Sequence, residues 1–304
     1  MQQGNIFIQM ATYAKKIFMK RGFMVLFVSL LSVNSSFSQA VKSSLLWEIS
    51  GNGLQAPSYL FGTFHIMCKG DFAVTGVLEA KLKETGQFYG ELKMDEPGMQ
   101  MKMMSKMTMA GTTLQSLLTE KEYTIVSSRF QTITGMSLAM MNHFKPFLPI
   151  SLLAINSTIC KETVQPENEF MSVAQKNKLP ILGLETIDDQ LNAIDKEPLD
   201  SQINDLKKIV MNFDSVKNVM TQLTAVYKLR DVDSLYSFMK TTGASKDFET
   251  ELLDKRNQNW IPVMQKAMGV KPSFFAVGAG HLGGPEGVIS LLRKQGYRLT
   301  PVKF

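Results

Sequence analysis

Apolar residues follow two kinds of pattern along the chain from about residue 44 onward. Short apolar runs bounded by turn residues are typical of buried strands, and apolar positions three or four residues apart are typical of amphipathic helices. These patterns predict strands at residues 45–49, 58–64, 87–92, 181–185, 273–277 and 297–302, and helices at residues 72–84, 170–178 and 287–295. The order strand, helix, strand near each end predicts βαβ units, which favour parallel pairing and a right-handed crossover.

Two helical stretches separate these units. Residues 95–155 are rich in methionine, and residues 187–270 form a long amphipathic tract. Methionine fills irregular cores and also lines adaptable binding grooves, so the first stretch is either ordinary helical core or a lid or peptide-binding cap. We expect one α/β domain over residues 41–304, with a mixed, largely parallel central sheet built from the N- and C-terminal βαβ units and a long helical insertion between them.

The first 40 residues have the organisation of an export signal. Four basic residues between Lys15 and Arg21 precede a short apolar run at residues 22–33, and a stretch ending in Ser38-x-Ala40 follows it. The run is shorter than the roughly 20 residues that a transmembrane helix needs. We expect residues 1–40 to be a cleaved signal peptide and the mature chain to be periplasmic or secreted, without a membrane span. An uncleaved N-terminal anchor is the alternative.

Composition and charge narrow the class of protein. Of the 304 residues, 44% are hydrophobic and 20% are charged, which excludes a disordered or low-complexity chain. Residues 1–40 hold four basic and no acidic residues, so the net charge of +6 falls to +2 without them. A balance so near neutrality predicts no nucleic-acid partner.

Export also changes how the two cysteines, Cys68 and Cys160, are interpreted. In an oxidising compartment the two thiols are permitted to pair. The sequence does not show whether their Cα atoms come within bridging distance, so a disulfide and two small buried hydrophobic side chains are both open.

Candidate chemistry lies where the predicted strands end. Of three histidines, His65 and His281 each follow an apolar strand in a Gly-x-x-His pattern, and His143 lies outside both motifs, in the helical insertion. Glu91 and Glu185 also end apolar strands. Glycine lets the backbone leave a strand sharply, and ligands of open α/β sheets bind at the carboxyl edge of the strands.

Two imidazoles with carboxylates suit a divalent ion, from zinc towards manganese as the oxygen ligands increase. Separately, a strand-end glutamate is more often a helix cap or half of a salt bridge, and a lone histidine is more often a core residue. Taken jointly, the four side chains indicate a shared site. No His-Glu-x-x-His motif occurs, which excludes the common zincin arrangement.

A resemblance makes the hypothesis more specific. The matching segments are Tyr59–His65, Gly90–Leu92, Leu182–Thr186 with Gln190, Arg256-Asn257 with Trp260, and Phe275–Gly284. Together they resemble the TraB/GumN family, which includes the Tiki proteases, over the chain from about residue 44 to the C-terminus. The resemblance implies a fold similar to the erythromycin-esterase and ChaN-like group, and a metal-dependent protease activity.

Position by position, the resemblance implies that His65, Glu91 and His281 hold the metal, with Glu91 also catalytic and with Glu185 and Arg256 as further catalytic candidates. The ion would be Mn, Co or Zn. The family often carries an acid beside an aromatic residue near position 166, where this chain has proline, and that departure argues against a role for Glu167.

These observations predict an exported metal-dependent hydrolase, a peptidase, acting on a peptide or protein substrate. The ion would activate water and polarise the scissile carbonyl, and the carboxylate that is not a ligand would serve as general base. Arg256 would steady an oxyanion or a substrate carboxylate, unless it lies on a solvated helix face. The alternative is a non-catalytic protein of the same fold that binds peptides or metal ions through its methionine-rich helices.

Overall fold

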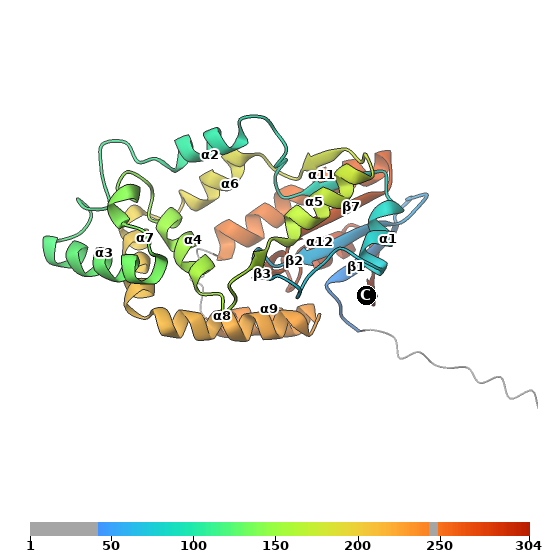
Figure 1. Ribbon diagram of the computed structural model, residues 1–304. Coiled ribbons are helices and arrows are strands. Elements are labelled where there is room, and N and C mark those ends of the chain that lie inside the picture. Colours follow the sequence, from blue (N-terminus) through green and yellow to red (C-terminus); the bar gives the residue numbers. More distant parts are fainter. Residues whose placement is uncertain (1–41, 243–248) are drawn as a thin grey trace, which may run out of the picture. The chain divides into compact units, whose positions relative to one another are not determined.

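The computed structural model describes residues 42–242 and 249–304, so the expected signal peptide lies outside the described residues (Figure 1). A six-stranded sheet forms the centre. Its strands, in spatial order, are β6 (Ile181–Gly183), β4 (Gln87–Gly90), β7 (Ser273–Gly278), β2 (Ser58–Thr63), β1 (Leu46–Gly51) and β8 (Tyr297–Val302). The first four run parallel, and β1 is antiparallel to both of its neighbours. The predicted mixed, largely parallel α/β fold is confirmed.

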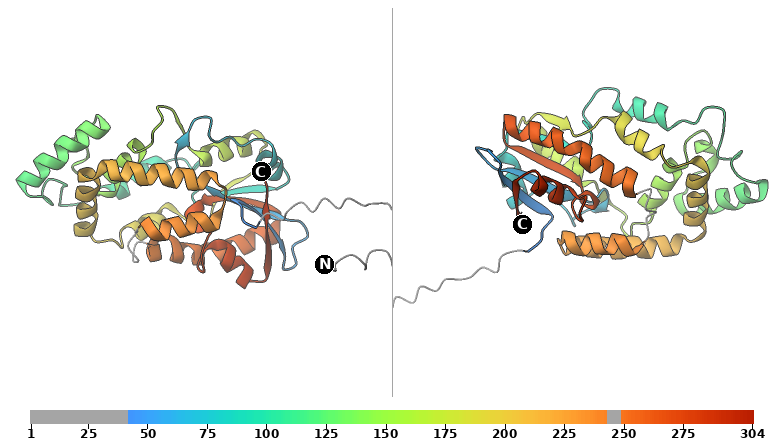
Figure 2. Two further views of the ribbon diagram at one scale, coloured as in Figure 1. Left: turned by 90° about the horizontal axis from the view of Figure 1, so that it is seen from below. Right: turned by 180° about the vertical axis from the view of Figure 1, so that it is seen from behind.

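The two middle strands, β2 and β7, are buried along their whole length. Parallel strands covered on both faces consist of nearly continuous apolar residues, which is why their sequences show no alternation. On one face, α5 (Pro166–Lys176) packs against β4, β6 and β7, and Phe170 contacts Phe88 and Phe274. On the other face, α11 (Lys255–Val270) accepts a hydrogen bond from Gln87, and α12 (Val288–Lys294) lies beside it (Figure 2).

In both predicted βαβ units, other strands lie between the two strands of the unit. From β2 the chain passes through α1 (Val77–Lys83) to β4, but β7 lies between these two strands. From β7 it passes through α12 to β8, which lies at the far edge beside β1. Apolar runs predict strands without saying which strands become neighbours, so the sequence did not reveal these insertions.

The two helical stretches pack on each other beside the sheet. Phe130, Leu153 and Leu206 are fully buried in a second apolar core that joins three helices of the two stretches. The helices of the first stretch are α2 (Met99–Met107), α3 (Glu120–Thr134) and α4 (Phe147–Asn156), and those of the second are α6 (Ile187–Ile194), α7 (Leu199–Met211), α8 (Phe213–Lys228) and α9 (Val232–Thr242).

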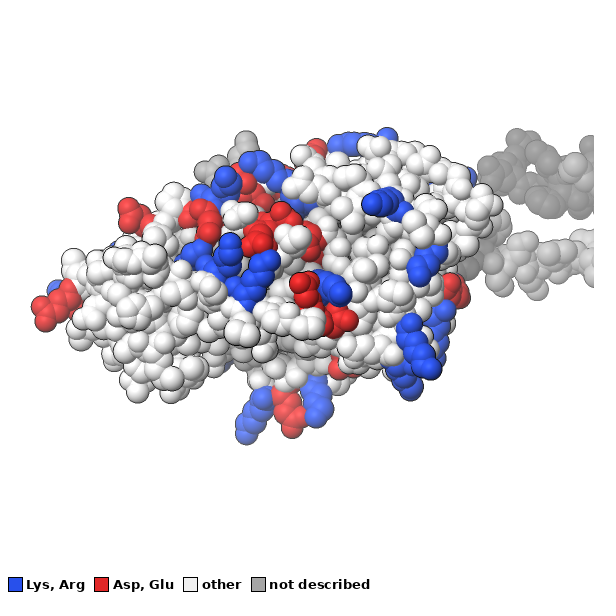
Figure 3. Space-filling view, turned by 90° about the horizontal axis from the view of Figure 1, so that it is seen from above, with Lys and Arg blue, Asp and Glu red and all other residues white. Residues whose placement is uncertain are grey.

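The methionine-rich helix α2 is only partly core. Met99 and Met107 are buried, whereas Met101 is 77% exposed. Lysines of α2 pair with an aspartate of α6, and on the face drawn in Figure 3 positive and negative side chains are interspersed. Within residues 42–242 and 249–304, no helix is long and apolar enough to cross a membrane.

A disulfide joins Cys68 to Cys160, with their Cα atoms 5.6 Å apart. The pair lies beside a two-stranded sheet of β3 (Met67–Cys68) and β5 (Thr163–Val164), elements too short to carry a sequence pattern. The disulfide answers the question that the sequence left open. It ties the loop after β2 to the segment that leads into α5.

Candidate functional site

Side chains from four parallel strand ends meet at the carboxyl edge of the sheet. His65 follows β2, Glu91 follows β4, Glu185 follows β6, and His281 follows β7 in a short 3-10 turn. Parallel strands direct their carboxyl ends to one edge, where ligands of such sheets bind. The structure therefore brings all four predicted side chains to one place, with Arg256 from α11 among them.

Glu91 lies at the centre of the site. Its Oε1 accepts a hydrogen bond from the Gly278 backbone N–H at 2.8 Å, and its Oε2 accepts from Arg256 Nη2 at 2.6 Å and from Gln190 Nε2 at 3.2 Å. Burial raises the pKa of Glu91, but the neighbouring His281, Arg256 and His65 together with the Gly278 amide hold the pKa at about 2. Glu91 is therefore an ionised carboxylate at neutral pH.

The two Gly-x-x-His motifs pack directly against each other. A Cβ placed on Gly278 would lie 3.3 Å from Glu91 Oε1 and 3.5 Å from His65 Nε2. A Cβ placed on Gly62 would lie 3.0 Å from the side chain of Ala279 and 3.1 Å from its backbone. Each glycine thus makes room for groups from the other motif, which gives a physical reason for the repeated pattern.

His65 is held by Glu167, a residue to which the sequence argument assigned no role. His65 Nδ1 lies 2.8 Å from Glu167 Oε1, and Thr63 Oγ1 donates to the same oxygen at 2.6 Å. The hydrogen bond to Glu167 raises the pKa of His65 to about 9, although the side chain of His65 is 74% exposed. Pro166 does not prevent this contact. It occupies the first turn of α5, a favoured place for proline, and Glu167 follows it facing β2.

Whereas the ring of His65 is held by a carboxylate, that of His281 is held by an amide side chain. Its Nδ1 lies 2.7 Å from Asn257 Oδ1, and Asn257 Nδ2 donates to the backbone oxygen of Glu286 at 2.9 Å, which fixes the amide orientation. Nδ1 therefore carries the proton, and Nε2 is left with its lone pair, 3.8 Å from Glu91 Oε1. Burial lowers the pKa of His281 to about 3, so the ring is neutral.

Arg256 is buried, so its alternative placement on a solvated helix face is wrong. Its Nε and Nη2 both donate to Glu185, at 3.1 Å and 2.6 Å. Its Nη2 also donates to Glu91, and Nη1 donates to the Leu252 backbone oxygen at 2.9 Å and lies 3.3 Å from His281 Nε2. The guanidinium thus spans both glutamates and one histidine in a fixed plane.

Glu185 lies behind Arg256. Its Oε2 accepts from the indole N–H of Trp260 at 3.0 Å, and its side chain is 5% exposed. Burial raises the pKa of Glu185 despite the neighbouring guanidinium. The carboxylate therefore holds Arg256 in position and does not face a pocket.

The site contains the side-chain types that bind divalent ions, although the structure does not gather them around one point. Both imidazoles are bonded through Nδ1, which leaves Nε2 as the atom that could bind a metal, and Glu91 is ionised. The ring of His281 is neutral, whereas His65 has to lose a proton before its Nε2 can bind. In the part of the chain that the structure describes, no three His, Cys, Asp or Glu side chains converge closely enough to form a metal-holding group. An ion here would take His65, His281 and Glu91 as ligands, with Arg256 alongside.

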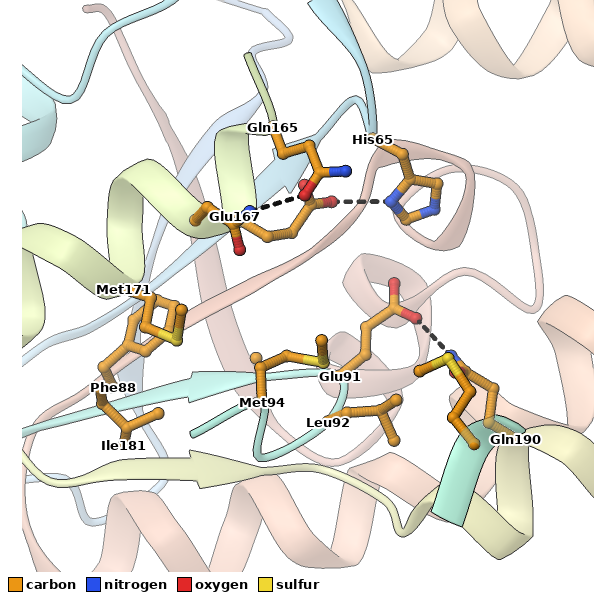
Figure 4. Close-up of a pocket in the computed structure, with 13 residues that line it drawn as sticks. His65, Phe88, Glu91, Leu92, Met94, Gln165, Glu167, Met171, Ile181 and Gln190 are labelled. Carbon is orange, nitrogen blue, oxygen red and sulfur yellow. Dashed lines mark hydrogen bonds and ion pairs between the residues drawn. The ribbon is translucent and has the colours of Figure 1, made fainter. Parts of the chain in front are cut away.

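Two apolar hollows meet at His65. The first, about 260 Å³, has His65, Glu91, Glu167 and Gln190 at its polar side (Figure 4). The second, about 330 Å³, contains Gly278 and His281 and is lined by apolar side chains of α8 and α9. The exposed His143 lines neither of them.

Fold and site together define an α/β protein with a histidine–glutamate–arginine centre at the carboxyl edge of its sheet. The chain belongs to the TraB/PrgY/gumN family, whose model matches residues 45–301. The match includes residues of all six strands of the central sheet and confirms the resemblance seen in the sequence. Comparison with curated proteins and with solved structures gives no match.

Sequence reasoning missed Thr63 and Glu167, which complete the site. Glu167 carried one usable signal, because an acid in the first turn after a proline marks a helix N-terminus. Its contact with β2 had no signal in the sequence.

Proposed function

We propose that this protein is an exported metal-dependent hydrolase, a peptidase. The observation that supports this most is the pair of histidines, each bonded through Nδ1, with His281 Nε2 3.8 Å from the ionised Glu91 and with His65 and Glu91 both packed against Gly278. Such an arrangement is expected of metal ligands whose tautomer is fixed by a neighbouring oxygen. A signal-like N-terminus and the Cys68–Cys160 disulfide support export to an oxidising compartment.

In this proposal His65, His281 and Glu91 hold an Mn, Co or Zn ion. The bound ion would supply a water of lowered pKa and polarise the scissile carbonyl. Glu167 keeps the proton of His65 on Nδ1, and Asn257 does the same for His281. Arg256 orients Glu91 and keeps a positive charge beside Glu91 and His281, where it would stabilise negative charge that develops on a substrate carbonyl.

We assign Glu167 the role of general base. Glu91 serves as a ligand and Glu185 is enclosed by Arg256 and Trp260, whereas Glu167 lines the pocket beside His65. A carboxylate in this position can accept the proton of the attacking water. The open hollows on both sides of His65 leave room for a chain to continue past the reacting bond, which favours a peptide substrate.

The test is cleavage of a broad peptide library by the purified protein with Mn²⁺, Co²⁺ or Zn²⁺, followed by mass spectrometry. We expect cleavage that is lost in His281→Ala and in chelator-treated protein. Absence of cleavage of any peptide or ester with every metal would contradict the proposal.

A non-catalytic peptide binder is the second candidate, favoured by the methionine side chains along the first hollow. Peptide capture that is unchanged in His281→Ala, with no cleavage by the wild type, would favour the binder.

A further inference from the structure

The hollow beside Glu91 and Glu167 has two chemically distinct parts. Its mouth is polar, with Gln190 bonded to Glu91 on one side and the Gln165–Asn168 amide pair on the other. Its interior is apolar and receives side chains from β4, β6 and α5 (Figure 4). The apolar lining residues are Phe88, Leu92, Met94, Met103, Met171 and Ile181.

The apolar part of the hollow is formed by buried residues of the sheet and by a flexible methionine of helix α5. Phe88, Leu92 and Ile181 are buried and belong to or follow strands of the central sheet. Met171 comes from helix α5 and is only partly buried. Because methionine is unbranched and flexible, such a wall accommodates side chains of different shapes.

Met171 is placed by the same helix that places Glu167. The two residues are four positions apart on α5 and therefore lie on one face, one turn apart. Glu167 contacts His65, and Met171 lies on the side of the hollow next to Phe88 and Ile181 (Figure 4). A group that fills the interior is thereby held within reach of the reacting centre.

The size of the hollow limits what it can hold. Its volume of about 260 Å³ is just below the range of roughly 300–1,000 Å³ typical of pockets that enclose a whole small ligand. It suits one large side chain with part of its backbone. A charged group in the interior would lose its hydration without a partner, so the interior excludes acidic side chains above all.

We propose that this hollow binds an apolar side chain, of the size of Leu, Met or Phe, from the substrate residue next to the hydrolysed bond, and that Met171 sets its size. This rests on the proposed peptidase function. The polar side chains of Gln165, Asn168 and Gln190 line the same hollow and would bond the substrate backbone.

The experiment uses a set of octapeptides that differ at one position, carrying Gly, Ala, Leu, Met, Phe, Asp or Lys. Cleavage by the purified protein is measured with Mn²⁺, and binding of the same peptides to chelator-treated wild type is measured by calorimetry. We expect Leu, Met and Phe to exceed Gly and Asp at least tenfold in both measurements, as for differences of one or more methylenes in an apolar pocket.

Met171→Trp fills the hollow and is expected to reduce the preference for Phe over Ala at least tenfold. Met101→Trp is the matched control, because this methionine is exposed on α2. Met171→Phe fills less volume and serves if the tryptophan variant melts early in a circular-dichroism check.

An unchanged side-chain ranking in the folded Met171 variants, with cleavage retained, would overturn the pocket assignment and leave the peptidase intact. No cleavage with any metal, together with binding that follows the same ranking and shifts in Met171→Trp, would overturn the peptidase and leave the pocket assignment standing.

Discussion

His65 Nδ1 lies 2.8 Å from Glu167 Oε1, although the two residues are 102 positions apart in the chain. One follows the central strand β2 and the other begins helix α5, and the Cys68–Cys160 disulfide ties the segments next to them together. This contact determines which nitrogen of His65 faces the site. Its consequences can be measured directly.

The first prediction concerns the charge of His65. Glu167 raises the pKa of His65 to about 9, so the ring of the metal-free protein is charged at pH 7.5. A pKa above the unfolded value of about 6.5 stabilises the fold fully below that pH, and the contribution is lost as pH rises towards 9. Glu167→Gln should return the pKa towards about 6.5, as measured by NMR titration of the ring protons. A value still near 9 would contradict the pairing.

The second prediction concerns metal binding. Only neutral histidine binds a metal, so binding at pH 7.5 should release the proton held by His65, and affinity should fall as pH is lowered. His65→Ala and His281→Ala should each remove most of the affinity, and Glu167→Gln should weaken it about 10–100-fold. Calorimetry in buffers of different ionisation enthalpy measures both the metal affinity and the number of protons released on binding. His143→Ala is the control, and equal affinity in all four variants and the wild type would exclude this site.

The third prediction concerns the buried Arg256. Arg256→Met leaves Glu91 and Glu185 without their shared partner, and should lower the free energy of unfolding by about 3–5 kcal/mol. Urea denaturation measures the change. Lys102→Met is the control, because its pair with Asp188 is exposed to solvent and should contribute little to stability. Similar effects of the two substitutions would contradict a structural role for Arg256.

The fourth prediction concerns Gly62. Gly62→Ala brings a Cβ to 3.1 Å from the Ala279 backbone and 2.9 Å from Leu282, and should destabilise the protein by about 1–3 kcal/mol through overpacking. Gly269→Ala is the control, since a Cβ there meets nothing within 4 Å in helix α11 and should stabilise by about 0.5–1 kcal/mol. Thermal unfolding distinguishes the two. Equal effects would show that the two motifs are not packed as described.

The fifth prediction concerns the disulfide, which joins two cysteines 92 residues apart in the sequence. Replacing Cys68 and Cys160 by serine should lower the free energy of unfolding by about 2–4 kcal/mol. It should also weaken metal binding, because the loop carrying His65 and the start of α5 are then joined less firmly. Retained metal affinity in a destabilised protein would separate the two effects.

The sequence by itself determined the strands and the residues at their ends. Continuous apolar runs such as those of β2 and β7 are explained only by burial on both faces, and glycine before a histidine indicates a sharp exit from a strand. Because parallel strands end at one edge, the sequence alone assigns His65, Glu91, Glu185 and His281 to a shared site. The family resemblance followed from the same segments.

Only the tertiary structure decided how those residues are paired. The sequence did not show that β7 lies between β2 and β4, that Glu167 holds His65, or that Glu185 faces Arg256 and not the pocket. The spacing of apolar residues along a segment shows which of its side chains are buried and whether it is a helix or a strand. It can do so because each residue's preference for burial depends on its own side chain. Strand order, the Cys68–Cys160 disulfide and the hydrogen-bond partner of a charged group depend on contacts between distant segments, and those are fixed only when the whole core packs.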